Sequence, residues 1–345
     1  MNPRNDNHLK LSSSSSSSSR PTAAKALDRR PPRRAPRRRP VSKSWAPAIL
    51  ATFFLIGCSD DFDSTSLVES TRVVGARVEV ANAPDRASPA PGETATVTWF
   101  VTAPAATPPL AWAFALCKPA PGGTLGCGDV PFAVFQGTGA PKVTLTLPAA
   151  DALAGLTHVA LFGRVCDDAA PIFDPSTGNP SCASGHGTTA SLSIRVQTTA
   201  DANHNPTAER GFTFDGQPWP ALAAGADPCV AGPRIAADEK SPHELGFSTA
   251  GADRESYATM TGDPPVATTA REALQVSLFT TTGKLKSPFA FIEAADARDT
   301  TPLTMKWTPP KAVDVAKDTP VTFTFVVRDD RGGADWTTRA ACVTP

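Results

Sequence analysis

Cysteine is the residue type whose number and spacing say most about chemistry in this 345-residue sequence. Six cysteines follow Cys58, an even number that suits disulfides if the chain is exported. Many pairings are open to six cysteines, and we favour three: Cys117 with Cys127 around a Pro-Gly-Gly turn, Cys166 with Cys182, and Cys229 with Cys342. The alternative is a metal site, but the sequence has no Cys-x-x-Cys pair and the spacings are wide. We therefore expect three structural disulfides and no favoured metal site.

Cys58 ends an apolar segment, residues 45–58, that is too short to span a bilayer as a helix but fits the apolar core of a signal peptide. Its last residues, Leu55-Ile56-Gly57-Cys58, resemble the bacterial lipobox. The resemblance implies lipidation of the Cys58 thiol, cleavage before it, and a membrane as partner through the lipid anchor. Ser59 in the next position implies sorting to the outer membrane. The alternative is an ordinary cleaved signal peptide in which this cysteine is a coincidence.

The charge of the chain is divided unevenly between its two ends. Residues 1–44 hold twelve Lys/Arg against two Asp, so the remainder holds 21 of the 33 basic and 31 of the 33 acidic residues. The basic, Ser- and Pro-rich segment precedes the expected cleavage point and would be discarded. An acidic mature chain lacks the basic face that nucleic-acid phosphates require, so we expect no nucleic-acid partner.

Sequence motifs of common enzymes are missing. There is no Gly-x-Ser-x-Gly elbow, P-loop or Gly-x-Gly-x-x-Gly. His243-Glu244 begins like a zinc-protease motif, but Phe247 stands where the second histidine would be needed. His186, between two glycines, has no catalytic partner nearby in sequence. We therefore expect no catalytic residues, although an enzyme of unrecognised type stays open.

The segment Asp201-Ala-Asn203-His-Asn205-Pro206 is the one place where the sequence hints at a ligand. It resembles the cadherin interdomain linker, whose oxygens bind Ca²⁺, and closely spaced oxygens are what Ca²⁺ needs. The resemblance makes Asp201, Asn203 and Asn205 weak calcium candidates. Two departures weaken it: His204 replaces an acidic ligand, and Asp253-Arg254-Glu255 falls in the second domain instead of the first. The alternative, which we favour, is a polar hinge with Asn-Pro turn chemistry and no cofactor.

Short runs of alternating or apolar residues between Pro and Gly turns begin at Val73 and predict strands. Seven runs within about 125 residues fit an immunoglobulin-like sandwich: 73–80, 94–102, 111–116, 131–135, 142–147, 157–166 and 190–197. A second unit shows fewer clear runs: 211–214, 234–236, 272–280, 288–294, 321–328 and 336–343. Its closing hairpin resembles the last strands of cadherin-like and PKD-like bacterial modules.

We therefore predict an all-β fold with two tandem immunoglobulin-like β-sandwich domains after a disordered N-terminal leader and tether. The expected parts are a low-complexity region with signal peptide (1–57), a tether (58–71), domain 1 (72–198), a linker (199–206) and domain 2 (207–345). The predicted function is a structural or binding role in the cell envelope, with envelope proteins or glycans as partners. An accessory lipoprotein of a secretion or transport assembly is the alternative.

Overall fold

The computed structural model of this protein describes residues 65–105, 107–123, 126–174, 178–198, 202–208, 211–298 and 300–345. The predicted leader, most of the tether, Cys58 and Asp201 lie outside these ranges. By its contacts the chain from Asp60 to Pro345 forms one unit.

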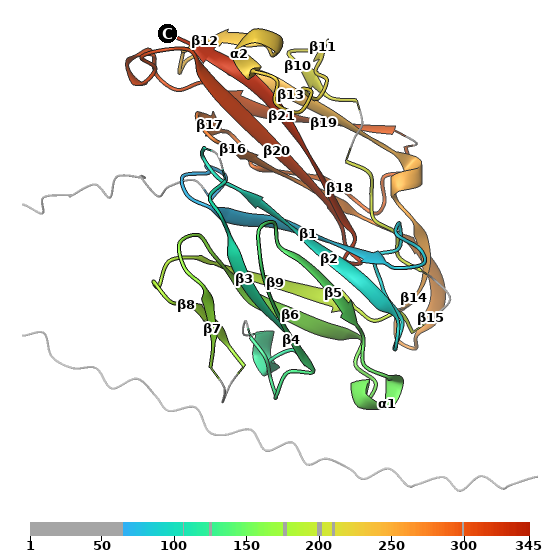
Figure 1. Ribbon diagram of the computed structural model, residues 1–345. Coiled ribbons are helices and arrows are strands. Elements are labelled where there is room, and N and C mark those ends of the chain that lie inside the picture. The colour runs from blue at the N-terminus through green and yellow to red at the C-terminus, as the bar shows by residue number, and fades with distance from the viewer. Residues whose placement is uncertain are drawn as a thin grey trace, which may run out of the picture. The chain divides into compact units, whose positions relative to one another are not determined.

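Strands are the main regular elements of the described chain, and they form two β-sandwiches with separate hydrophobic cores (Figure 1). In the first sandwich the sheets have the orders β1-β2-β5 and β4-β3-β6-β9. The first order corresponds to strands A-B-E of an immunoglobulin-like domain and the second to C-F-G with one further strand, β4, beside C. The bounds are β1 Arg72–Val80, β2 Thr94–Thr102, β3 Ala111–Cys117, β4 Ala133–Thr138, β5 Lys142–Thr146, β6 His158–Cys166 and β9 Thr188–Arg195. Shorter elements connect them: η1 Pro121–Gly123, α1 Ala150–Leu153, β7 Pro171–Phe173 and β8 Pro180–Cys182.

The core of the first sandwich follows from the alternation of its strands. In β5 the side chains of Val143 and Leu145 are buried while their polar neighbours are exposed. Two tryptophans fill this core: Trp99 stacks on Phe114 with ring centroids 4.9 Å apart, and Trp112 is buried beside them. A Cβ atom at Gly137 would lie 2.2 Å from the Trp112 ring, so glycine is required there for the ring to pack on β4.

The second sandwich has two five-stranded sheets in the orders β11-β10-β13-β19-β17 and β12-β21-β20-β16-β18. β12 runs parallel to β21 and all other pairs in these sheets are antiparallel. The sheet strands are β10 Thr213–Phe214, β11 Gln217–Pro218, β12 Arg234–Ala236, β13 His243–Ala250, β16 Leu274–Thr280, β17 Lys284–Leu285, β18 Phe289–Ile292, β19 Thr300–Thr308, β20 Thr319–Asp329 and β21 Ala334–Thr344. A separate hairpin and short helical turns complete it: β14 Ser256–Thr261, β15 Val266–Arg271, α2 Pro228–Ala231, η2 Gly251–Asp253 and η3 Ala312–Asp314.

Aromatic side chains fill the second core. The Trp307 and Trp219 rings each meet the Phe323 ring edge-on, with centroids 5.0 and 5.2 Å apart. Phe325 comes from the same face of β20, as the strict alternation of this strand predicts. The prediction of an all-β fold with two tandem immunoglobulin-like sandwiches is therefore confirmed.

Individual strands of the second sandwich were harder to predict. All seven strands expected in the first sandwich are present, with boundary shifts of up to three residues. In the second, the sequence analysis missed β13 and β19, which pair along their full lengths. Pro302 interrupts β19 and Gly246 interrupts β13, so the alternation of apolar and polar residues in these strands is hard to recognise in the sequence. The hairpin β14–β15 is largely exposed on both faces, so it has no hydrophobic pattern that would reveal it.

Candidate functional site

The segment joining the two sandwiches lies against a loop of the first one. Residues 203–205 run antiparallel to residues 85–87, with the Ala87 amide donating to the Asn203 carbonyl (2.7 Å) and the Asn205 amide to the Asp85 carbonyl (2.7 Å). These backbone bonds extend the first sandwich into the linker, so the connection is not a free hinge.

The two asparagines of the linker use their side-chain amides to hold the second sandwich. Asn205 donates from Nδ2 to the Val78 carbonyl (2.7 Å), while its Oδ1 accepts from the Ala334 amide (3.0 Å). Asn203 is fully buried. Its side-chain amide is oriented so that the nitrogen faces an acceptor and the oxygen faces a donor. In this orientation Nδ2 donates to Glu272 Oε1 (2.7 Å) and Oδ1 accepts from the Gly333 amide (3.1 Å). Each amide thus bridges segments far apart in the chain.

A charged network surrounds these amides, and we call it the joint network: His204, Glu255, Glu272, Asp329 and Arg331. His204 Nδ1 contacts Glu255 Oε1, and its backbone amide donates to the other carboxylate oxygen (3.0 Å). Arg331 Nη1 lies 3.1 Å from Glu272 Oε1 and 3.4 Å from Glu255 Oε2. Asp329 Oδ1 accepts the Arg331 and Gly333 amides of the turn between β20 and β21 (both 2.8 Å). The network ties the linker to three loops of the second sandwich.

Burial changes the acid–base behaviour of this network. Glu272 is only 1% exposed. Burial raises the pKa of its carboxyl to about 8, and the neighbouring Asp329 and Glu255 carboxylates act in the same direction. The Glu255 amide, which donates to Glu272 Oε2 (2.9 Å), and Arg331 oppose this rise without cancelling it. Burial likewise raises the pKa of Asp329. The joint therefore contains acidic groups that bind protons more tightly when folded.

The two sandwiches also pack directly on each other beyond the linker. The first sandwich contacts the second mainly through strands β1 and β21. Arg77 Nη1 on β1 contacts Asp335 Oδ1 on β21 at 2.7 Å, and the Phe100 and Trp336 rings stack with centroids 5.2 Å apart. A Cβ atom at Gly75 would lie 3.2 Å from the Val326 side chain, which shows how close the sheets approach. Apolar, aromatic and ionic contacts thus combine in one interface.

The calcium candidates are only partly visible in this arrangement. Asp201 lies outside the described residues, while Asn203 and Asn205 are both present at the joint. Their side-chain oxygens accept backbone amides, which leaves them engaged within the protein. Sequence reasoning missed Glu272, Asp329 and Arg331, because residues up to 128 positions from the linker reach it only through the fold. It noted Glu255 but expected its triplet to lie on the wrong side of the linker.

We expect millimolar calcium to leave the melting temperature unchanged, because the oxygens of Asn203 and Asn205 are already hydrogen-bonded. Thermal unfolding with and without calcium, in the wild type and in Asp201→Ala, measures this directly. A ligand at about 100 times its Kd would stabilise the folded state by roughly 2.7 kcal/mol. A calcium-dependent rise that disappears in Asp201→Ala would contradict the expectation.

Three disulfides are present, and they join the cysteines in the three pairs favoured from the sequence. They are Cys117–Cys127, Cys166–Cys182 and Cys229–Cys342, with Cα atoms 5.4, 5.7 and 4.7 Å apart. Three disulfides are typical of a protein that folds outside the reducing cytoplasm.

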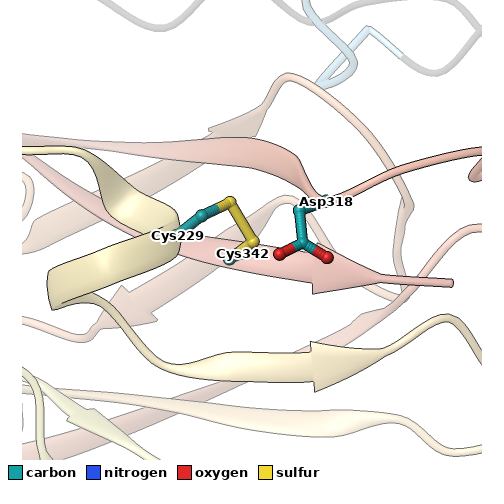
Figure 2. Close-up of side chains that lie close together, drawn as sticks. All are labelled: Cys229, Asp318 and Cys342. Carbon is teal, nitrogen blue, oxygen red and sulfur yellow. A yellow bond between two sulfur atoms is a disulfide. The ribbon is translucent and has the colours of Figure 1, made fainter.

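Among the described residues, one group of metal-ligating side chains lies close together: Cys229, Asp318 and Cys342. Figure 2 shows that the two sulfur atoms are bonded to each other, with the Asp318 carboxylate beside them. A cysteine binds a metal as its thiolate, and a cysteine in a disulfide has none to offer. Asp318 instead pairs with Arg234 Nη2 at 2.7 Å. The group is therefore a structural crosslink.

One histidine–carboxylate pair has a geometry that occurs in catalysis. His243 Nδ1 lies 2.7 Å from Asp215 Oδ2 at the surface of the second sandwich. In the described ranges no serine, threonine or cysteine side chain hydrogen-bonds to His243, so the nucleophile of a triad is missing there. His186, the other histidine considered, sits in an exposed turn where its backbone amide donates to Ser184 Oγ (3.1 Å).

Comparison with known proteins adds little to this description. No family model matches the chain, and no curated protein matches it. Solved structures do match, among them the two tandem V-type regions of a v-region-containing chitin-binding protein. That match has 9% sequence identity, covers 79% of this chain and 100% of the other, and has a TM-score of 0.22. A likeness at that level carries no argument about this chain.

None of the helices in the described part of the chain is both long and apolar enough to cross a membrane.

Proposed function

We propose that this protein is a lipid-anchored protein of the cell envelope, attached through Cys58, that presents two rigidly joined β-sandwiches for a structural or binding role. The outer membrane is the favoured location, on the evidence of Ser59. The lipobox-like segment supports the anchor, and the disulfides support an oxidising compartment.

The joint between the sandwiches is the observation that carries the structural or binding role. An enzyme needs a convergent set of reactive groups, whereas the buried polar residues Asn203, Glu272 and Arg331 come together where the two domains meet. Such groups are costly to bury unless their partners are in place, so the arrangement favours one fixed angle between the domains. A fixed angle presents a continuous surface that spans both domains.

Radiolabelled palmitate tests the anchor. We expect label in the wild type and none in Cys58→Ala, which should also leave the membrane fraction, because the thiol is the point of lipid attachment. Cys58→Ser, which replaces the thiol by a hydroxyl of similar size, is the matched variant and should behave like the alanine variant. Equal labelling of all three proteins would overturn the proposed anchor and location.

A further inference from the structure

Two large aromatic side chains are exposed on the edge strand β18 of the second sandwich. Phe289 is 43% exposed and Phe291 58% exposed. They alternate with Ala290 and Ile292, which pack into the core. Because alternate residues of a strand share a face about 6.7 Å apart, the two rings form a row on the outer face of the sheet. Core packing does not explain aromatic residues placed there.

Strand register shows what surrounds this row. Phe291 pairs with Gln275 and Phe289 with Ser277, and these residues pair in turn with Arg328 and Val326. Val326 is already covered by the first sandwich at Gly75. The outer face of this sheet is thus occupied by domain 1 over β20 and β21, while its β18 edge stays open.

A pocket of about 280 Å³ opens beside Phe291, close to the lower end of the range of about 300–1,000 Å³ typical of ligand sites. Its polar lining includes Gln275, Arg328 and the carboxylates of Glu293 and Asp330. Arg328 is engaged, since its guanidinium donates to Ser277 Oγ (3.1 Å) and to the Val74 carbonyl. Glu293 and Asp330 are exposed, and within the described ranges neither carboxylate makes a hydrogen bond or ion pair.

We propose that Phe289, Phe291 and this pocket form a glycan-binding site. The inference rests on the proposed function and deepens it by naming a ligand class. The C–H face of a sugar ring packs on an aromatic ring, while its hydroxyl groups donate hydrogen bonds to acceptors at the rim. The Glu293 and Asp330 carboxylates accept such donors and repel anions, whereas the donors of the Arg328 guanidinium in the same lining are used by Ser277 and Val74. The carboxylates therefore favour a neutral or N-acetylated glycan over an acidic one.

Binding of the full chain to soluble oligosaccharides tests the site. The probes are cellohexaose and chitohexaose as neutral chains and an oligogalacturonate as the acidic chain, measured by calorimetry. We expect a neutral chain to bind and the oligogalacturonate to bind at least tenfold more weakly. Phe289→Ala/Phe291→Ala should weaken binding at least tenfold, and Glu293→Gln/Asp330→Asn should reduce the preference for the neutral chain.

Ile172→Ala is the matched control, because Ile172 is an apolar side chain of similar exposure (54%) on the first sandwich. It should bind as the wild type does. All the substituted side chains are exposed, so their variants should keep the wild-type melting temperature, and that measurement confirms folding.

The inference is overturned if the wild type binds neither neutral chain, if the phenylalanine variant binds as tightly as the control, or if the acidic chain binds best. Capture of an envelope protein through the two phenylalanines, without glycan binding, overturns it as well. The palmitate result is independent of these outcomes. If the protein is labelled with palmitate but binds no glycan, only the glycan-binding site is refuted. If it binds glycan but is not labelled, only the lipid anchor is refuted.

Discussion

Replacing Cys229 and Cys342 together by alanine should lower the free energy of unfolding by about 4–5 kcal/mol, the largest effect we expect from removing any of the three disulfides. This disulfide closes a loop across a sequence separation of 113 residues. In the chain-entropy account, a crosslink stabilises by restricting the unfolded chain, and the restriction grows with loop length. Denaturant unfolding of the oxidised proteins measures the difference.

Cys117→Ala/Cys127→Ala provides the matched control. Its separation is only 10 residues, and each disulfide has one fully buried partner, Cys117 or Cys342. The cost of leaving a small cavity is therefore similar in both variants, while the loop term should be only about 3 kcal/mol in the control. Equal losses in the two variants, or a larger loss in the control, would show that loop length does not set the contribution of the long disulfide.

Stability should fall as the pH rises from about 4.5 towards 8, through the raised pKa of Glu272. In this window the folded protein holds a proton on Glu272 that the unfolded chain has released, so each increase in pH favours unfolding. The contribution is fully present below the unfolded pKa of 4.5 and is lost as the pH passes about 8. A shift of this size corresponds to roughly 3–5 kcal/mol.

Glu272→Gln isolates the effect, because glutamine keeps the shape of the side chain and does not titrate. We expect denaturant unfolding between pH 5 and 9 to show a clearly flatter pH dependence for this variant than for the wild type. Asp329, whose pKa is also raised, should leave a residual slope of the same sign. Glu244→Gln is the control for the chemical change itself, since Glu244 is an exposed carboxylate on β13 that is not part of the joint network. An unchanged slope in Glu272→Gln would show that this carboxyl is ionised in the folded protein at neutral pH.

These two predictions concern different states of the protein. The long disulfide acts mainly on the unfolded chain, whereas Glu272 acts on the folded joint.

Local pattern was sufficient for much of this fold. Proline and glycine turns around short alternating runs predicted the seven strands of the first sandwich, because alternation is a property of neighbouring residues. The Cys117–Cys127 pair was favoured because it closes a Pro-Gly-Gly turn, and the Cys229–Cys342 pair because it ties the first loop of domain 2 to its last strand; the structure contains both, together with Cys166–Cys182. Lipidation at Cys58 is a prediction of the same kind, from a contiguous motif, and it stays a prediction.

The joint was decided only by tertiary structure. Asn203 was recognised as a polar linker residue, but its burial depends on Glu272 and Gly333, which lie 69 and 130 positions further along the chain. The pKa of Glu272 likewise depends on the neighbours that the fold brings around it. Phe289 and Phe291 looked like ordinary strand residues, since an apolar side chain on a strand gives no sign of which face it occupies until its partners are known. The sequence alone determined the strands of the first sandwich and favoured the cysteine pairs that form. The burial of the joint, the pKa of Glu272 and the exposed face of β18 arose from contacts between segments that no local pattern connects.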